Sequence, residues 1–124
     1  MSNFTTDGRV NAPNYVRFGT PYATAFQEAI INNSAASGNY NVIAGVAGQT
    51  IKIYRMFFIV GGTNTVTIED GTTPLTGGMP FTGGGALVLD HQGEPWFTCS
   101  AGNAFNINSG SAIQVSGRVY YLQG

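Results

Sequence analysis

The chain has 124 residues, of which 43% are hydrophobic and 9% charged, and its formal net charge is -1. This length suits one domain with a single core and a short additional segment. It is too short for two domains that each have a hydrophobic core of their own. The five basic residues offer no electrostatic footprint for a phosphate backbone or an acidic membrane surface, which argues against nucleic-acid and membrane binding. No apolar run approaches the roughly 20 residues that a membrane-spanning helix needs.

The N-terminal sequence has neither the basic start nor the apolar stretch of a secretory signal peptide. We therefore expect the protein to stay in the cytoplasm of the cell that makes it until it is assembled. The single cysteine, Cys99, cannot form a disulfide within the chain. Packing and oligomerisation must then stabilise the fold, and we expect a homo-oligomer, either a dimer or a trimer.

Residues 1–23 contain two prolines and lack sustained alternation of apolar and polar side chains. Large apolar side chains nevertheless recur through the segment at irregular intervals. We expect an extended N-terminal arm that docks on a partner, and the alternative is a disordered tail. The candidate contact residues of the arm are Phe4, Tyr15, Phe18 and Tyr22.

Residues 24–124 are expected to form one β-domain. Alternation over 24–33 is partial and favours a first strand over a short helix. The rest of the chain consists of short apolar runs separated by turns rich in Gly and Asn, a spacing typical of a sandwich or barrel. With the first segment the strands number eight, which predicts an all-β, jelly-roll-like antiparallel β-sandwich. The further strands are expected at 40–46, 50–60, 65–69, 87–89, 96–99, 105–107 and 113–122, with 50–60 and 65–69 joined as a hairpin.

The longest expected strand, 50–60, ends in five consecutive apolar residues. Alternation sends Phe57 and Ile59 to one side, and the other three to the opposite side. One set can fill the core, and the other set then needs a cover, which indicates an assembly protein. We assign Met56, Phe58 and Val60 to partner contact, together with the arm.

No catalytic, cofactor-binding or metal-binding residue can be identified, so we expect no enzyme activity and no cofactor. Asp90, His91 and Glu94 form the densest group of titratable side chains, but a jelly-roll metal centre needs several histidines and the chain has one. Cys99 lies in an expected strand close to Trp96. This context predicts a small buried apolar side chain rather than a nucleophile.

A set of short motifs runs from Val46 to the end of the chain. They are GQTIKI at 48–53, TVTI at 65–68, TPLTGGMP at 73–80, PWFT at 95–98, AGNAFNIN at 101–108 and VSGRVYY at 115–121. As a set, these motifs resemble small virion proteins of tailed bacteriophages that sit on or near the head as decoration, cement or head-fibre components.

The resemblance implies a jelly-roll-like sandwich on the capsid exterior that carries no cofactor. Such proteins look like clamps across neighbouring subunits of the major capsid protein, often through an N-terminal arm. Tail or fibre locations stay open. The alternative is a carbohydrate-binding β-sandwich or tail-fibre component that recognises a host glycan through exposed aromatic side chains. The candidate aromatic residues are Trp96, Tyr40, Tyr54, Tyr120 and Tyr121.

Overall fold

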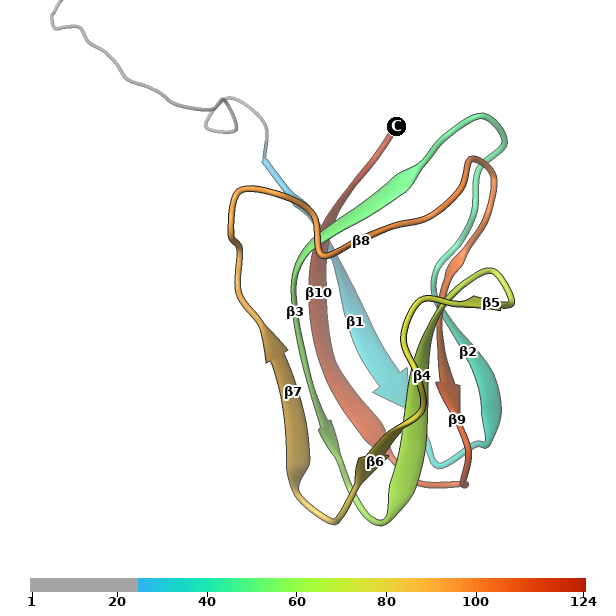
Figure 1. The fold of residues 1–124 in the computed structure, drawn as a ribbon, viewed down its shortest axis with the longest axis vertical. Coiled ribbons are helices and arrows are strands. Elements are labelled where there is room, and N and C mark those ends of the chain that lie inside the picture. The colour runs from blue at the N-terminus through green and yellow to red at the C-terminus, as the bar shows by residue number, and fades with distance from the viewer. Residues whose placement is uncertain (1–24) are drawn as a thin grey trace, which may run out of the picture.

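The computed structural model describes residues 25–124, and 56% of them lie in strands. The strands form two antiparallel sheets that pack face to face as a sandwich (Figure 1). The all-β prediction is confirmed. The predicted arm, residues 1–23, lies outside the described residues. Within the described part of the chain, no helix has the length and apolarity to cross a membrane.

The first sheet, sheet A, has the strand order β1-β10-β3-β7, and β8 pairs with β3 as well. Its strands are β1 (Gln27–Asn33), β3 (Ile51–Val60), β7 (Gly85–Leu89), β8 (Phe97–Thr98) and β10 (Val115–Gln123). The second sheet, sheet B, has the order β2-β9-β4-β5, and β6 also pairs with β4. Its strands are β2 (Gly38–Ile43), β4 (Asn64–Asp70), β5 (Thr73–Pro74), β6 (Met79–Phe81) and β9 (Phe105–Ser109).

The strand order is that of a jelly roll. Strands β7 and β8 pair with different parts of β3, and β5 and β6 pair with different parts of β4. Each five-stranded sheet therefore has four strand positions, and the sandwich has eight in all. The chain crosses between the sheets from β1 to β2, from β2 to β3 and from β3 to β4, so most strands pair with partners distant in sequence.

The predicted hairpin between the third and fourth strands is wrong, because β3 belongs to sheet A and β4 to sheet B. The chain crosses from one sheet to the other at residues 61–63. There the N–H of Gly61 donates to the carbonyl of Gln114, and a Cβ on Gly62 would lie 3.2 Å from Cδ1 of Ile113. A hairpin within one sheet and a crossing between two sheets can each join two amphipathic strands through a glycine-rich turn. The local sequence therefore cannot distinguish a hairpin from a crossing.

The hydrophobic core lies between the two sheets and is built from the inward side chains of both. Val66 and Ile68 of β4 are fully buried, as the sequence predicts. Phe58 of sheet A and Phe105 of sheet B are the largest fully buried side chains. The other fully buried residues of the core are Ile31, Ile51, Ile53, Met56, Val60, Cys99, Ile107, Val115 and Val119.

A small polar cluster joins the sheets at one end of the core. The Oγ of Ser109 accepts hydrogen bonds from the side-chain amides of Asn33, at 3.4 Å, and Asn64, at 3.3 Å. Asn33 belongs to sheet A and the other two residues to sheet B. Because all three side chains are buried, these bonds hold β1 against β4 and β9 in one arrangement.

Candidate protein-binding face

Three of the predicted contact residues do not reach the surface. Met56, Phe58 and Val60 are buried in the core, whereas Phe57 and Ile59 on the same strand are 44% and 52% exposed. The assignment of the first three to partner contact is therefore wrong, but a surplus of apolar side chains on β3 is present on its other face. The other predicted contacts, Phe4, Tyr15, Phe18 and Tyr22, lie outside the described residues.

A β-bulge explains why the assignment fails. Ile51 and Ile53 are buried, so strict alternation would continue inward with odd-numbered residues. Opposite β3, however, Tyr120 pairs with Arg55 and the next residue pairs with Ile53, which leaves Tyr54 as an extra residue. The extra residue shifts the alternation by one position. Even-numbered side chains then fill the core in the second half of the strand.

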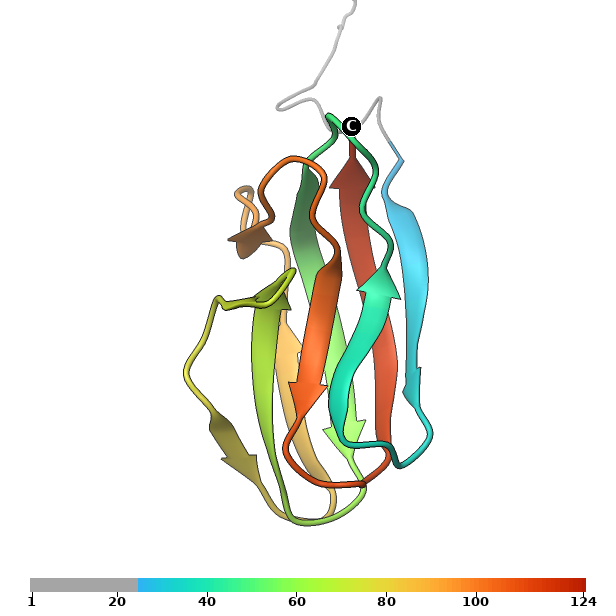
Figure 2. The same cartoon turned by 90° about the vertical axis from the view of Figure 1, so that its right-hand side faces the viewer.

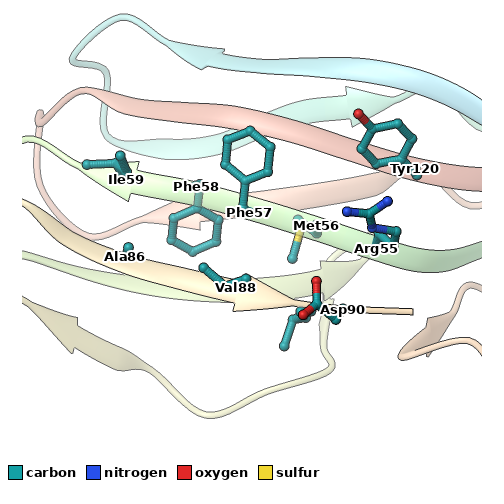
Figure 3. Close-up of a pocket in the computed structure, with 10 residues that line it drawn as sticks. Arg55, Met56, Phe57, Phe58, Ile59, Ala86, Val88, Asp90 and Tyr120 are labelled. Carbon is teal, nitrogen blue, oxygen red and sulfur yellow. The ribbon is translucent and has the colours of Figure 1, made fainter. Parts of the chain in front are cut away.

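The outer face of sheet A carries an ordered row of side chains. Backbone pairing places Ile30 of β1 next to Arg118 of β10, Arg118 next to Phe57 of β3, and Phe57 next to Val88 of β7. The adjacent row contains Asn32, Ser116, Ile59 and Ala86. Figure 3 shows the part of this face where β3 and β7 lie side by side.

The exposed apolar side chains of the two rows form what we call the apolar patch: Ile30, Phe57, Ile59 and Val88. Ile30 is 63% exposed and Val88 is 64% exposed. Two hollows flank Phe57, one of about 220 Å³ toward β7 and one of about 570 Å³ toward β1. Phe57, Ile59 and Val88 are neighbours on β3 and β7, and Arg118 of β10 separates them from Ile30. Scattered apolar residues are normal on a protein surface, but a contiguous group such as these three marks an interaction site.

Ile30 and Val88 were not among the predicted contact residues, although the sequence carries a signal for them. Ile30 is followed by another isoleucine, and Val88 lies between two leucines. Consecutive apolar residues in a strand must point to opposite faces, so one of each group must turn away from the core. Which one does so depends on the register of the strand in the sheet.

Charged and aromatic side chains lie within and beside the apolar patch, with Arg118 between Ile30 and Phe57. Arg118 forms an ion pair with Glu28 at 2.8 Å, and the guanidinium of Arg55 lies 5.2 Å from the centre of the Tyr120 ring. A hydrogen bond with Tyr120, together with the charge of Glu28, raises the pKa of Arg118 above its ordinary value. An exposed ion pair such as Arg118–Glu28 contributes little to the stability of the fold. Its two side chains can therefore exchange partners at low cost when another protein binds.

The aromatic candidates for glycan binding do not share one surface. Tyr40 belongs to β2 of sheet B, Tyr120 to the outer face of sheet A, and Tyr121 packs partly buried against the core. Trp96 is exposed, and its indole N–H donates to the carbonyl of Asp90 at 2.6 Å. Tyr54 packs with Phe26 and His91 in a separate cluster, with ring centres 5.0 to 5.5 Å apart.

The structure does not assemble a Cys-His pair. His91 packs on the rings of Phe26 and Tyr54, whereas Cys99 is fully buried and its Sγ lies 3.9 Å from the carbonyl of Ala104. Among residues 25–124, no group of three or more His, Cys, Asp or Glu side chains is arranged to hold a metal ion.

Cys99 is expected to resist thiol reagents in the folded protein. Burial, and secondarily the charge of Asp70, raise the pKa of Cys99 to about 11. At pH 8 only about one thiol in a thousand is then ionised, and the thiolate is the reactive form. Labelling with a chromogenic disulfide should be slow in buffer and fast in denaturant. Fast labelling of the folded protein would contradict this burial.

Asp70 is expected to make the domain sensitive to acid. Burial raises the pKa of Asp70, but hydrogen bonds from Ser100 and Asn103 outweigh burial and lower it overall. Its Oδ2 accepts from both the backbone N–H and the hydroxyl of Ser100, each at 3.0 Å. A lowered pKa in the folded state means that stability is present above the unfolded-state value of about 3.9 and is lost as pH falls through the folded value.

The measurement is urea unfolding of Asp70→Ala and the parent protein at neutral and acidic pH. At neutral pH the variant should lose about 1–3 kcal/mol, because the donors on Ser100 lose their acceptor. The difference should shrink on acidification. The exposed Asp90→Ala serves as the control with little effect on stability. A difference that is independent of pH would show that the Asp70 charge is not responsible.

Comparison with protein-family models, with curated proteins and with solved structures gives no match for this chain. The resemblance to phage head proteins therefore stays a prediction, and the functional proposal rests on the face described above.

Proposed function

We propose that this chain is a non-enzymatic virion protein of a tailed bacteriophage. In this proposal it decorates or cements the head by binding the lattice of the major capsid protein through the outer face of sheet A. The observation that carries the proposal is the apolar patch, in which Ile30, Phe57, Ile59 and Val88 occupy neighbouring rows and stay exposed. The motif resemblance supplies the identity of the partner.

The shape of the face favours a protein partner over a small molecule. Small-molecule sites are concave and bury most of the ligand, with a few polar groups that converge on it. Here the larger hollow, toward β1, lies open on the outside of the sheet, and only the smaller one, toward β7, is partly enclosed. The neighbouring polar groups pair with each other, as Arg118 does with Glu28. Exposed apolar side chains with an arginine among them are typical of protein interfaces, in which aromatic residues and Arg are enriched.

The stabilising mechanism is mass action. A protein that binds only the assembled lattice stabilises each site by RT ln(1 + [L]/Kd), and this contribution repeats over the many symmetric copies of the shell. The charged side chains of Arg55, Arg118 and Glu28 would orient the domain on its partner. No covalent bond is made or broken in this function.

The test is co-sedimentation of the purified protein with undecorated capsids, together with the heat resistance of the mixture. The parent protein should bind and raise the temperature at which capsids disrupt. Phe57→Ser should lower the affinity by about tenfold or more, because it removes an aromatic side chain from the centre of the face. The matched control is Val46→Ser, which alters an equally exposed apolar residue, at 44%, in the connection after β2.

Two outcomes would count against the proposal. Absence of co-sedimentation by the parent protein would reject the capsid as the partner. Equal binding by Phe57→Ser and Val46→Ser would reject the outer face of sheet A as the binding surface.

Glycan recognition is the second candidate, and the exposed indole of Trp96 favours it. Its N–H is already bonded to the Asp90 carbonyl, which holds the ring in place. Since Trp96 is the only tryptophan in the chain, intrinsic fluorescence reports on it directly. A saturable change in fluorescence on titration with host surface glycan, unaffected by Phe57→Ser, would support this alternative.

A further inference from the structure

Strand β1 forms the outer edge of sheet A at one side of the sandwich (Figure 2). It pairs with β10 along its full length, from Gln27 to Asn33, without a register shift. Among residues 25–124, no strand pairs with its other edge. An edge strand of this kind presents backbone donors and acceptors that another strand can use.

The open groups of this edge can be identified from one hydrogen bond. The N–H of Asn32 donates to the hydroxyl of Tyr40 at 3.2 Å, and Tyr40 belongs to sheet B. The N–H of Asn32 therefore points away from β10. Since backbone direction alternates along a strand, the N–H and C=O groups of Glu28 and Ile30 also face the open edge. The N–H and C=O groups of Glu28 and Ile30 have no hydrogen-bond partner among residues 25–124.

The other edges of the two sheets are poorly suited to pairing. In sheet B, β5 and β6 have two and three residues and contain Pro74 and Pro80. Strand β2 carries a register shift between Asn41 and Ile43. In sheet A, β7 has five residues and begins at a glycine. Short strands, prolines and bulges are devices that protect sheet edges, and β1 has none of these three. Its edge carries one charged residue, Glu28, and the Tyr40 hydroxyl covers it only at Asn32.

We propose that β1 pairs with β1 of a second copy of this chain, antiparallel about a two-fold axis, so that two copies of sheet A form one continuous sheet. The axis passes between the two copies of Ala29. In this register Glu28 of each copy lies opposite Ile30 of the other. The open N–H and C=O groups of both residues are then all satisfied.

Local geometry selects this register. If Ile30 faced itself across the axis, Asn32 would have to give up its hydrogen bond to Tyr40. With Ala29 on the axis, that bond stays intact. Ala29 then meets its counterpart at a position without mutual hydrogen bonds, where Cα atoms approach to about 4.5 Å and a small side chain fits. Glu28 brings no unpaired charge to the joint, because Arg118 of its own copy neutralises it.

The pairing would join the two binding faces. The row from Ile30 to Val88 in one copy would continue into the same row of the second copy. Ile30, 63% exposed in the single chain, would be covered by the stem of Glu28 from the other copy. A repeated lattice would then be held at two points, which raises the overall affinity without new kinds of contact. The dimer itself does not depend on what the face binds.

The test combines mass measurement with register-specific cross-linking of the full chain. Light scattering after gel filtration should give twice the chain mass of 13.0 kDa. Ile30→Pro removes an N–H that no residue of the same copy uses, and edge positions tolerate proline. This variant should keep its circular dichroism spectrum while the dimer dissociation constant rises by about tenfold or more.

Ala29→Cys should form a disulfide between copies under mild oxidation, since the expected Cα separation lies within the range of disulfides. Asn39→Cys, exposed on β2 of sheet B, is the matched control that should stay monomeric on a non-reducing gel. Cys99 does not interfere, because it is buried.

A parent protein that is monomeric over the whole accessible concentration range would overturn the proposal. A dimer that is unaffected by Ile30→Pro and does not cross-link through residue 29 would also overturn it, because another surface would then join the copies. If Ile30→Pro fails to fold, cross-linking at residue 29 decides alone. A cross-linked dimer that does not bind capsids would leave this inference standing and reject only the proposed partner.

Discussion

Replacing Gly117 with alanine is expected to lower the free energy of unfolding by about 3 kcal/mol or more. Gly117 lies in β10, opposite Phe58 of β3. A Cβ at this position would overlap the carbonyl oxygen of Phe57 and lie 2.7 Å from both the carbonyl carbon of Phe57 and the Cα of Phe58. All of these are backbone atoms, which cannot move without separating the two central strands of sheet A.

Gly77→Ala is the matched control for this substitution. No atom lies within 4 Å of a Cβ added at Gly77, and its backbone is not in the left-handed region. We expect the control to change stability by no more than about 0.5 kcal/mol. Urea unfolding of both variants, followed by circular dichroism, measures the difference. Equal stability of the two variants would show that β3 and β10 are not as closely apposed as described here.

Phe58→Ala is expected to cost about 3–5 kcal/mol, whereas the same change at Phe57 should cost less than about 1 kcal/mol. Phe58 is fully buried and meets Phe81 edge to face, with ring centres 5.6 Å apart. Its removal leaves a cavity between the sheets. Phe57 points to solvent on the opposite face of the same strand, so its removal leaves none.

This comparison also tests which face of β3 is buried. Urea midpoints of the two variants measure stability, and co-sedimentation with capsids measures binding. Phe58→Ala should reduce stability and Phe57→Ala should reduce binding while leaving the domain folded. The reverse order of stabilities would place Met56, Phe58 and Val60 on the surface, as the sequence analysis assigned them.

The edge of sheet A relates the two proposals. The apolar patch ends at Ile30 on β1, and β1 is also the strand whose outer edge is open. A second copy joined there would extend the patch across the two-fold axis. The affinity for a repeated partner would then depend on the dimer, so Ile30→Pro should weaken lattice binding as well as dimerisation.

Several features of the fold could be predicted from local sequence. The alternation of Val66 and Ile68 locates β4 and its inward face, and Cys99 beside aromatic residues is buried as expected. The eight expected strands equal the eight strand positions and indicated the jelly roll, but two errors cancel in this count. The runs 87–89 and 96–99 were counted as two strands, although β7 and β8 share one position beside β3. Strands β5 and β6 were missed because their few residues lie in a segment dominated by Gly, Pro and Thr.

The alternation of apolar residues and the positions of turns are properties of short segments. The amino-acid sequence alone therefore determined the all-β class and the surplus of apolar side chains on 50–60. Tertiary structure decided which side of β3 became the surface, which sheet received β4 and why residue 117 must be glycine. Each of these depends on pairing with a strand far away in the chain. The bulge at Tyr54 reverses the inward side of β3 only because β10, about 60 residues later, sets the register there.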